Sequence, residues 1–474
     1  MSKQRLIHSI AIAALLACAT ANAVRLSLDD SGQVLLFPLF LTGGSFQTIF
    51  EIRNQSDLGK ALRLVVKDPV NARPTLSLNI YLAPGDSWSS ALFSPDPDQP
   101  VRTATAVLAK SEDASCTFPE RSAIPDTGMT LSEAFFSEDL SGIVLSQSRR
   151  ALGFVEVYEM GAMEPALATD CEEISQRFSD GGIWTTTPNQ DLLPPGGGVE
   201  GYAILVDVDQ GRAHQYEALA LEDFRDSALH THPLTSRQPN LMDVSPAESR
   251  VLETVEFGNR TLQVERVSNW SQTPVHAVDA LLMATEARTD YSVAANLDAT
   301  VFTTLNFPTR AYHADVERFY LAQGQDRVLA PFQTSLPLAA AENLEANAIE
   351  VTSVDREGRN FTLQPFSGRV NCDLANSAVT TVFMSNTIGF TQPCDYTEGE
   401  FRVPNNAMEG EVRYQLSGEI VSDEGHVFSG LPIAGFVIQS IRNTQIDVAP
   451  GVRGIADYGW ARALKIERQV TDPQ

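Results

Sequence analysis

The chain lacks the short motifs that mark the common enzyme classes. It has no Gly-x-Ser-x-Gly elbow, no His-Glu-x-x-His pair, no phosphate-binding loop and no dinucleotide fingerprint. Paired acids such as Glu172-Glu173 carry no information about glycosidase chemistry in a chain with 60 Asp and Glu residues. We therefore expect no catalytic residues and no cofactor, and the sequence favours a protein that is not an enzyme.

Positive charge is also scarce. The 34 Lys and Arg residues stand against 60 Asp and Glu residues, which gives a formal net charge of -26 at pH 7. Nucleic acids and anionic lipid surfaces are bound through basic patches, so this balance argues against both as partners. The excess of negative charge is explained by solubility and does not require a bound cation.

Histidine is rare, with seven in the chain, and one close pair stands out. His230 and His232 have the i, i+2 spacing at which side chains of a strand share a face and can ligate one metal. Pro233 follows at once and no carboxylate lies between Ala228 and Gln238, so we interpret the pair as part of a solvated loop. Because Cys-x-x-Cys is also absent, we expect no zinc site.

Cysteines are few but even in number once the N-terminal segment is set aside. Cys18 lies in that segment, and the others are Cys116, Cys171, Cys372 and Cys394. An even number in an exported chain indicates disulfides, and four cysteines allow three pairings. We favour Cys116–Cys171 and Cys372–Cys394, because these pairs close the shorter loops.

The N-terminal segment has the three parts of a secretory signal. Lys3 and Arg5 provide positive charge, an apolar stretch runs from Leu6 to Ala17, and Ala21-Asn22-Ala23 has the small-x-small pattern of a cleavage site. The sequence therefore predicts that residues 1–23 are a signal peptide, cut between Ala23 and Val24.

Two alternatives for this segment stay open. A membrane anchor is weaker because the apolar stretch is shorter than the ~20 residues that span a bilayer. Lipidation of Cys18 partly fits Leu15-Leu16-Ala17-Cys18, although Leu16 is bulky for that pattern. No later stretch approaches ~18 consecutive apolar residues, so we expect no transmembrane segment in a mature protein that is periplasmic, outer-surface or extracellular.

Alternation of apolar and polar residues dominates the rest of the chain and predicts half-buried strands. Turn-forming clusters such as Pro84-Gly85-Asp86 separate these short runs. The fold class predicted is all-β, with mainly antiparallel β-sandwich domains of immunoglobulin-like or jelly-roll type. The alternating runs are found at residues 48–53, 62–67, 76–82, 202–208, 262–264, 301–307 and 411–416.

Helical periodicity is rare and predicts one or two short helices, over residues 216–229 and 339–348. The segment 231–246 contains three prolines and little periodicity, so we place the main division there. The predicted regions are an N-terminal β-sandwich with long loop insertions over 24–245 and a C-terminal β-sandwich over 246–474.

Two local motifs have structural explanations. Asp207-x-Asp209-x-Gly211 resembles the start of a calcium loop but lacks the later ligands, so we interpret it as a strand that ends in a turn. Trp88 follows the strand at 76–82 and the Pro84-Gly85-Asp86 turn. If this turn closes a hairpin, the indole covers one end of the core. The other tryptophans, Trp184, Trp270 and Trp460, are scattered, and we expect each to serve packing as well.

Several segments together resemble a family of uncharacterised secreted proteins from Gram-negative bacteria. The resemblance runs nearly end to end, although Asp457-Tyr458-Gly459-Trp460 departs from the family pattern of Asn-Tyr-Gly-Gly. It implies export and a fold that uses the whole chain, and it implies no catalytic residue. The resembling segments are residues 32–38, 78–88, 115–117, 153–161, 229–231, 306–310 and 430–436.

These observations favour an exported, non-enzymatic structural or adhesive protein of the bacterial envelope or cell surface, with an unknown protein or glycan partner. One alternative is an extracytoplasmic binding module for a glycan, a small molecule or a partner protein. A third hypothesis is a hydrolase with an unfamiliar site. A deep pocket with convergent polar groups would favour the hydrolase, and a shallow aromatic strip would favour the binding module.

The cleavage site gives the first testable prediction. The exported protein should begin at Val24, because signal peptidase needs the small residues Ala21 and Ala23. N-terminal sequencing of the protein recovered from its bacterial compartment checks this. A lipid-modified Cys18 at the N-terminus would contradict it.

Overall fold

The computed structural model is built almost entirely from antiparallel sheets, which confirms the all-β prediction. Within the described strands, every pairing is antiparallel except that of β22 with β23. No helix in these parts of the chain is both long and apolar enough to cross a membrane. The structure describes residues 23–69, 72–96, 98, 104–132, 151–209, 211–235, 237–257, 260–293, 299–315, 328–332, 350–362, 379–385, 398–402 and 408–473.

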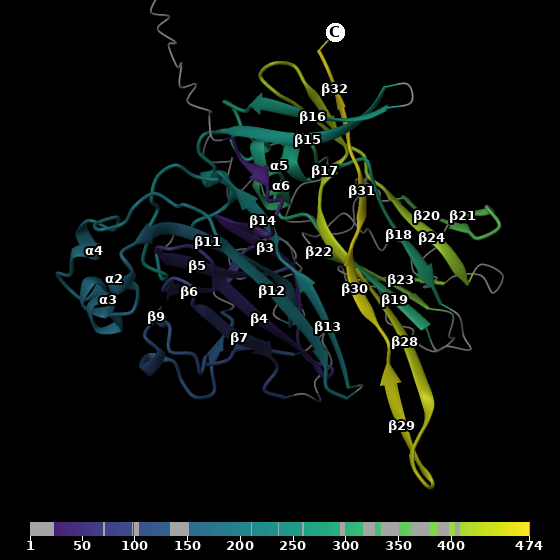
Figure 1. Ribbon diagram of the computed structural model, residues 1–474, viewed down its shortest axis with the longest axis horizontal. Helices are drawn as coiled ribbons and strands as arrows, with labels where there is room; N and C mark the ends of the chain where they lie inside the picture. Colours follow the sequence, from purple (N-terminus) through teal and green to yellow (C-terminus); the bar gives the residue numbers. More distant parts are fainter. Residues whose placement is uncertain are drawn as a thin grey trace, which may run out of the picture.

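Two sheets form a sandwich in the N-terminal half, with the main hydrophobic core between them (Figure 1). The first sheet has the order β1 (Arg25–Leu26), β14 (Leu219–Glu222), β3 (Val34–Leu41), β11 (Leu152–Met163), β5 (Gly59–Lys67), β6 (Pro74–Leu82), β9 (Cys116–Phe118). The second has the order β10 (Met129–Thr130), β8 (Val107–Leu108), β7 (Ser87–Phe93), β4 (Phe46–Asn54), β12 (Val199–Asp207), β13 (Arg212–Glu217), and β2 (Ser31–Gly32) also pairs with β12.

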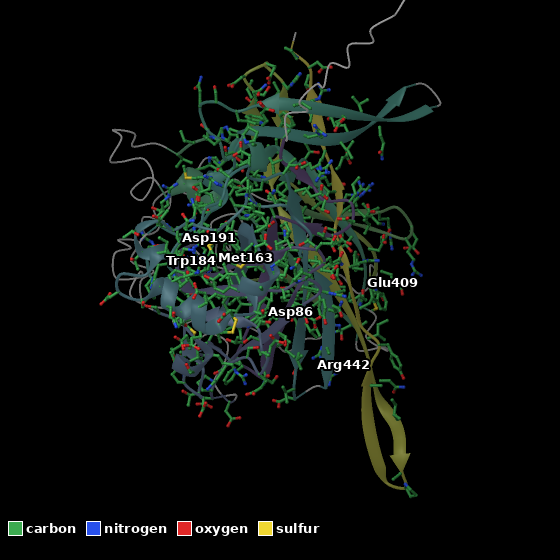
Figure 2. All side chains as sticks on the ribbon, turned by 60° about the vertical axis from the view of Figure 1, so that its left-hand side comes forward. Asp86, Met163, Trp184, Asp191, Glu409 and Arg442 are labelled. Atoms are coloured by element: carbon green, nitrogen blue, oxygen red, sulfur yellow. A yellow bond between two sulfur atoms is a disulfide. The ribbon has the colours of Figure 1, made fainter. Side chains whose placement is uncertain are left out.

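The first sheet is buried on both faces. Every residue of β3, β5 and β11 is buried, whereas β4 and β12 of the second sheet alternate between buried and accessible positions. Short helices cover part of the outer face of the first sheet, around a cluster that includes Tyr81, Met163 and Trp184 (Figure 2). These helices are α2 (Pro165–Ala168), α3 (Cys171–Phe178) and α4 (Ile183–Thr186). Two 3-10 turns lie elsewhere in the chain, η1 (Arg121–Ala123) after β9 and η2 (Leu241–Asp243) before β15.

A second sandwich lies in the C-terminal half, with a core that includes Tyr291, Val301, Tyr414 and Val437. One sheet has the order β21 (Asn360–Thr362), β20 (Glu350–Asp355), β24 (Glu409–Gln415), β18 (Glu286–Ser292), β31 (Lys465–Glu467). The other has the order β23 (Glu398–Arg402), β22 (Val379–Ser385), β19 (Ala299–Asn306), β28 (Ala434–Ala449), β29 (Val452–Asp457), and β30 (Trp460–Ala463) also pairs with β28.

Smaller elements complete the C-terminal half. Two short helices, α5 (His276–Leu282) and α6 (Arg310–Ala314), lie near the N-terminal sandwich in Figure 1. The remaining pairings are the ribbon of β15 (Glu248–Phe257) with β16 (Arg260–Asn269), the pair of β17 (Met283–Ala284) with β27 (Leu431–Pro432), and the sheet of β25 (Glu419–Val421), β26 (Val427–Ser429) and β32 (Gln469–Thr471).

The two halves share hydrophobic contacts across the predicted division at residue 245. Tyr216 of β13 stacks on Phe436 of β28, with ring centroids 4.2 Å apart. A second cluster joins Val34 and Leu221 of the first sheet to Val278 and Leu281 of α5. Each described sheet nevertheless draws its strands from one side of residue 245. The division at that residue stays a prediction.

The helix predicted over residues 216–229 is wrong. Residues 212–217 form β13, which pairs with β12, and residues 219–222 form β14, which pairs with β3. The pairing of these strands with neighbours far along the chain outweighs a weak helical pattern. The described residues contain five α-helices rather than one or two, and α3 is the longest at eight residues. The helix predicted over 339–348 lies outside the described residues.

Trp88 is buried in the main core, as predicted, with 1 % of its surface exposed. The predicted hairpin of the strands on either side of the Pro84-Gly85-Asp86 turn is wrong, because β6 belongs to the first sheet and β7 to the second. The turn between them crosses the sandwich and is held by Asn54, whose carbonyl accepts from Gly85 N at 2.9 Å and whose N–H donates to the Asp86 carbonyl at 2.9 Å. The Asp86 carboxylate accepts from Ser87 N at 2.9 Å, so the turn is fixed on both sides.

His230 is buried rather than solvated, which corrects the loop interpretation. It is 2 % exposed and packs against Trp184, Tyr81 and Phe178. Because a carbonyl only accepts, the 2.8 Å contact with the Pro188 oxygen assigns the proton to Nδ1, and Nε2 accepts from the Tyr81 hydroxyl at 2.9 Å. Aromatic packing and two satisfied nitrogens place the neutral imidazole in the core, where sequence spacing alone could not put it.

The role of Trp88 is testable by truncation. We expect Trp88→Ala to lower the free energy of unfolding by about 3–5 kcal/mol, because the change leaves a cavity in the main core. Trp460→Ala is the matched control, since Trp460 is 45 % exposed and its loss should change stability by less than about 0.5 kcal/mol. Chemical denaturation of both variants checks this, and equal midpoints would contradict the core role of Trp88.

Burial lowers the pKa of His230 to about 3, and the hydrogen bond to the Pro188 carbonyl only partly opposes this. Between pH 6.5 and about 3, His230 is therefore protonated in the unfolded chain but neutral in the folded protein. The free energy of unfolding falls as the pH is lowered through this window, because the unfolded state binds more protons. We expect His230 to contribute a loss of up to about 1.4 kcal/mol per pH unit.

His230→Gln removes this titration but leaves the carboxylates in place. Denaturation curves at pH 7 and pH 4.5 should show a smaller pH dependence for His230→Gln than for the wild type. Equal pH dependence in the two proteins would overturn the assignment.

Candidate functional site

β28 is the longest strand of the described chain, and its two parts have different surroundings. The first part, from Ala434 to Ile441, lies inside the C-terminal sandwich and pairs with β19 and β30. The second part pairs with β29, from Arg442 opposite Asp457 to Ala449 opposite Val452. We call this hairpin of residues 442–457 the arm.

The arm extends away from both sandwiches, as two views separated by 60° agree (Figures 1 and 2). Val437, Ile438, Ile441 and other β-branched residues favour an extended chain along β28. At the tip, Pro450 fixes the first turn position, and Gly451 takes a positive φ of 77° at the second. Among the described strands, only β29 pairs with residues 442–449, so no third described strand covers the outer edges of the arm.

Two exposed aromatic residues lie where the arm joins the body. Tyr458 is 57 % exposed and Trp460 is 45 % exposed, and they are separated only by Gly459. The backbone N–H of Tyr458 donates to the Ile441 carbonyl at 2.9 Å, which places this segment beside the last body residue of β28. Trp184 and Trp270 are buried, as expected, but the expectation of a packing role is wrong for Trp460.

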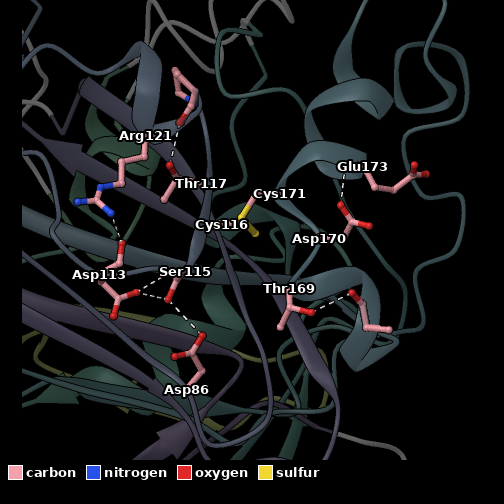
Figure 3. Close-up of a disulfide and its surroundings, with 12 residues drawn as sticks. Asp86, Asp113, Ser115, Cys116, Thr117, Arg121, Thr169, Asp170, Cys171 and Glu173 are labelled. Atoms are coloured by element: carbon pink, nitrogen blue, oxygen red, sulfur yellow. Dashed lines mark hydrogen bonds between the residues drawn. A yellow bond between two sulfur atoms is a disulfide. The ribbon is translucent and has the colours of Figure 1, made fainter.

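The predicted pairing of Cys116 with Cys171 is confirmed (Figure 3). The disulfide ties β9 to the start of α3, where Asp170 caps the helix by accepting from Glu173 N at 3.0 Å. Cys372 and Cys394 lie outside the described residues, so their pairing stays a prediction.

An open cleft of about 580 Å³ lies beside this disulfide, between the β9–η1 segment and α3. Its charged lining residues are Glu120, Arg121 and Glu172, and the others are mostly serine, threonine and glutamine. Ser122 donates its hydroxyl to the exposed Glu120 carboxylate at 3.1 Å, and the lining residues include no histidine to act as the base of a hydroxyl nucleophile.

A buried cluster of His276, Asp279 and His313 joins α5 to α6. Asp279 and His313 have no exposed surface, and the side chain of His276 is 15 % exposed. His313 Nε2 is 2.7 Å from Asp279 Oδ2, and His276 Nε2 is 3.9 Å from the same oxygen. The three residues bring two imidazoles and one carboxylate within 4.8 Å of one another.

Ring packing fixes both imidazoles of this cluster. The rings of His276 and His313 stack with centroids 5.0 Å apart, Trp270 lies 5.6 Å from His276, and Phe332 lies 5.9 Å from His313. His276 Nε2 is also 3.1 Å from the Ala330 carbonyl oxygen. Burial lowers the pKa of His276, and the nearby Asp279 carboxylate partly opposes this effect.

The sequence expectations did not bring these residues together. His276 and Asp279 have the i, i+3 spacing of one helix face, which is visible in the sequence, but α5 is too short for a periodic pattern to predict it. His313 is far along the chain, and only the contact of α6 with α5 makes it a neighbour. The expectation of no zinc site considered close sequence pairs and did not weigh these three residues together.

The remaining predicted positions have structural surroundings. Val24 donates its N–H to the Glu248 carbonyl at 2.8 Å and bridges to Ser249, so Ala23 and Val24 lie buried against β15. Cleavage between them stays a prediction. Asp207 ends β12, as predicted, and its carboxylate accepts from the Ser45 hydroxyl at 2.7 Å and pairs with Arg212 at 3.3 Å.

Comparison of the chain with protein-family models, with curated proteins and with solved structures finds no match to any of them. The resemblance to secreted proteins of Gram-negative bacteria therefore stays an interpretation of the sequence, and the geometry of the arm and of the buried cluster is what bears on function.

Proposed function

We propose that this chain is an exported, non-enzymatic structural or adhesive protein of the bacterial envelope or cell surface, which holds a protein partner through the arm. The observation that carries the proposal is the second part of β28, which leaves the sandwich and continues as a two-stranded hairpin. A hairpin without a third strand or a core of its own is marginally stable in water. A partner strand that pairs with the edge of the arm would stabilise it, which is why we assign the arm a binding role.

Main-chain pairing is the interaction that the arm offers. An extended segment of a partner that adds to an exposed strand edge gains a row of backbone hydrogen bonds, and side-chain pockets then give specificity. The anchoring of β28 between β19 and β30 fixes the position and register of the arm before the partner arrives. Little ordering entropy is then lost on binding.

Export is supported by the chemistry of the chain. The Cys116–Cys171 disulfide suits an oxidising compartment, such as the periplasm or the cell surface. The net charge of -26 favours solubility there and disfavours nucleic acid as a partner.

A glycan-binding module is the second candidate, and it is favoured by the exposed Tyr458 and Trp460. These two exposed aromatic residues stand two positions apart in the chain, and aromatic residues are enriched at interaction surfaces. In that case the aromatic pair, rather than the strand edge of the arm, would carry the binding.

Two variants separate these candidates. The first replaces residues 443–456 by Asn-Gly, a sequence suited to a two-residue hairpin turn between the paired Arg442 and Asp457. The second is Tyr458→Ala with Trp460→Ala in the intact arm. The measurement is the fraction of each mature protein retained on washed envelopes of the bacterium that produces it.

We expect the armless variant to lose retention while its melting curve stays that of the wild type, because the sandwich cores are untouched. The aromatic double variant should keep its retention. Full retention of the armless variant would refute the proposal, and loss of retention in the aromatic variant alone, with competition by free sugar, would establish the glycan candidate.

A further inference from the structure

We propose that His276, Asp279 and His313 form a binding site for one divalent transition-metal ion of the zinc type. The site is independent of the arm and of the proposed function. Two imidazoles and one carboxylate are a ligand set found in zinc sites, and three protein ligands leave a further position for water or another group.

The strongest reason is the electrostatics of Asp279. Its carboxylate is completely buried in α5, among Ala277, Val278 and Ala280. Oδ2 accepts from His313, but Oδ1 is buried with no hydrogen-bond partner among the described residues. A buried carboxylate oxygen without a partner is costly, because the group loses its hydration and receives nothing in return. A cation bound between the carboxylate and the two imidazoles removes this cost.

The distances between ligand atoms suit a small ion. Metal–ligand bonds of about 2.0–2.1 Å in a tetrahedron separate the donor atoms by about 3.3–3.4 Å. Here His313 Nε2 and His276 Nε2 lie 2.7 and 3.9 Å from Asp279 Oδ2, on either side of that value. Shifts of the donor atoms by less than about 1 Å bring both pairs to the ligand separation. Binding also requires both imidazoles to carry their proton on Nδ1, and His276 Nε2 then exchanges its hydrogen bond to the Ala330 carbonyl for the ion.

The surroundings are those of a ligand site rather than of a solvated ion pair. Stacking of His276 on His313, with Trp270 and Phe332 beside them, restricts the rotation of both imidazoles. The 15 % exposure of the His276 side chain gives the ion a way in from solvent. The alternative occupant is a proton, which would make Asp279 and His313 a simple ion pair.

Zinc titration of the whole mature protein separates the metal from the proton. After removal of metals with a chelator, calorimetry should show one strong site per chain, and cobalt(II) bound there should give the visible absorption of low-coordinate nitrogen and oxygen ligation. The measurement is made in an excess of Mg²⁺, which occupies the many surface carboxylates but competes poorly for imidazole.

Asp279→Asn keeps the shape of the side chain, and His276→Ala alters the rim of the site, so both should fold. We expect each to weaken zinc binding at least about tenfold. His232→Ala removes a half-buried histidine elsewhere and should leave binding unchanged. Absence of a stoichiometric site in the folded wild type, or equal affinity in His276→Ala and wild type, would overturn the proposal. Circular dichroism confirms that each titrated protein is folded.

Discussion

Burial of the first sheet on both faces places cationic side chains in the interior, and the arrangement of the outer layer depends on how these charges are paired. β5 carries Lys60, Arg63 and Lys67, all of them almost completely buried. An isolated buried charge is prohibitively costly, so each cation needs a partner, and breaking one such pair costs more than the pair contributes. Apart from Asn79 in the adjacent strand β6, the partners come from segments that are far from β5 in the sequence.

Each pairing fixes a different part of the outer layer. Lys60 Nζ lies 2.7 Å from Glu159, whose two oxygens also accept from Gly196 N and Gly197 N, so the Pro-Gly segment before β12 is held against the sheet. Arg63 donates to Asn79, Thr231 and Gln238, which fixes the segment that follows His230.

Lys67 pairs with Glu156 and lies 3.0 Å from the Tyr312 hydroxyl in α6. Tyr312 is the neighbour of His313 in the chain, so this hydrogen bond links the ion pair of the first sheet to the segment that carries the buried cluster with Asp279.

The sequence predicted what depends on local pattern. Strands with one accessible face, such as β4 and β12, alternate between apolar and polar residues, and this pattern predicted them. The preference for short loops predicted the Cys116–Cys171 disulfide. β3 and β11 were known only as segments of a resemblance, because strands buried on both faces can read as apolar runs without period two. β5 is equally buried but was found, because its buried Arg63 and Lys67 create the alternation at 62–67. β14 was mistaken for helix, since its pairing with β3 is a tertiary contact that leaves no local signal. The buried cluster depends on the same kind of contact.

The arm and the first sheet represent opposite solutions to the same backbone requirement. Every N–H and C=O group taken from water needs a partner, and the first sheet meets this with neighbours on both sides of β3, β11 and β5. In the arm, each strand has a neighbour on one side among the described strands, and no described strand covers its other edge. β28 continues from the C-terminal sandwich into the arm. The paired residues 434–441 in the sandwich therefore hold residues 442–449 of the arm in an extended conformation. A partner that pairs with the arm would therefore meet a strand whose direction and register are already set by the sandwich.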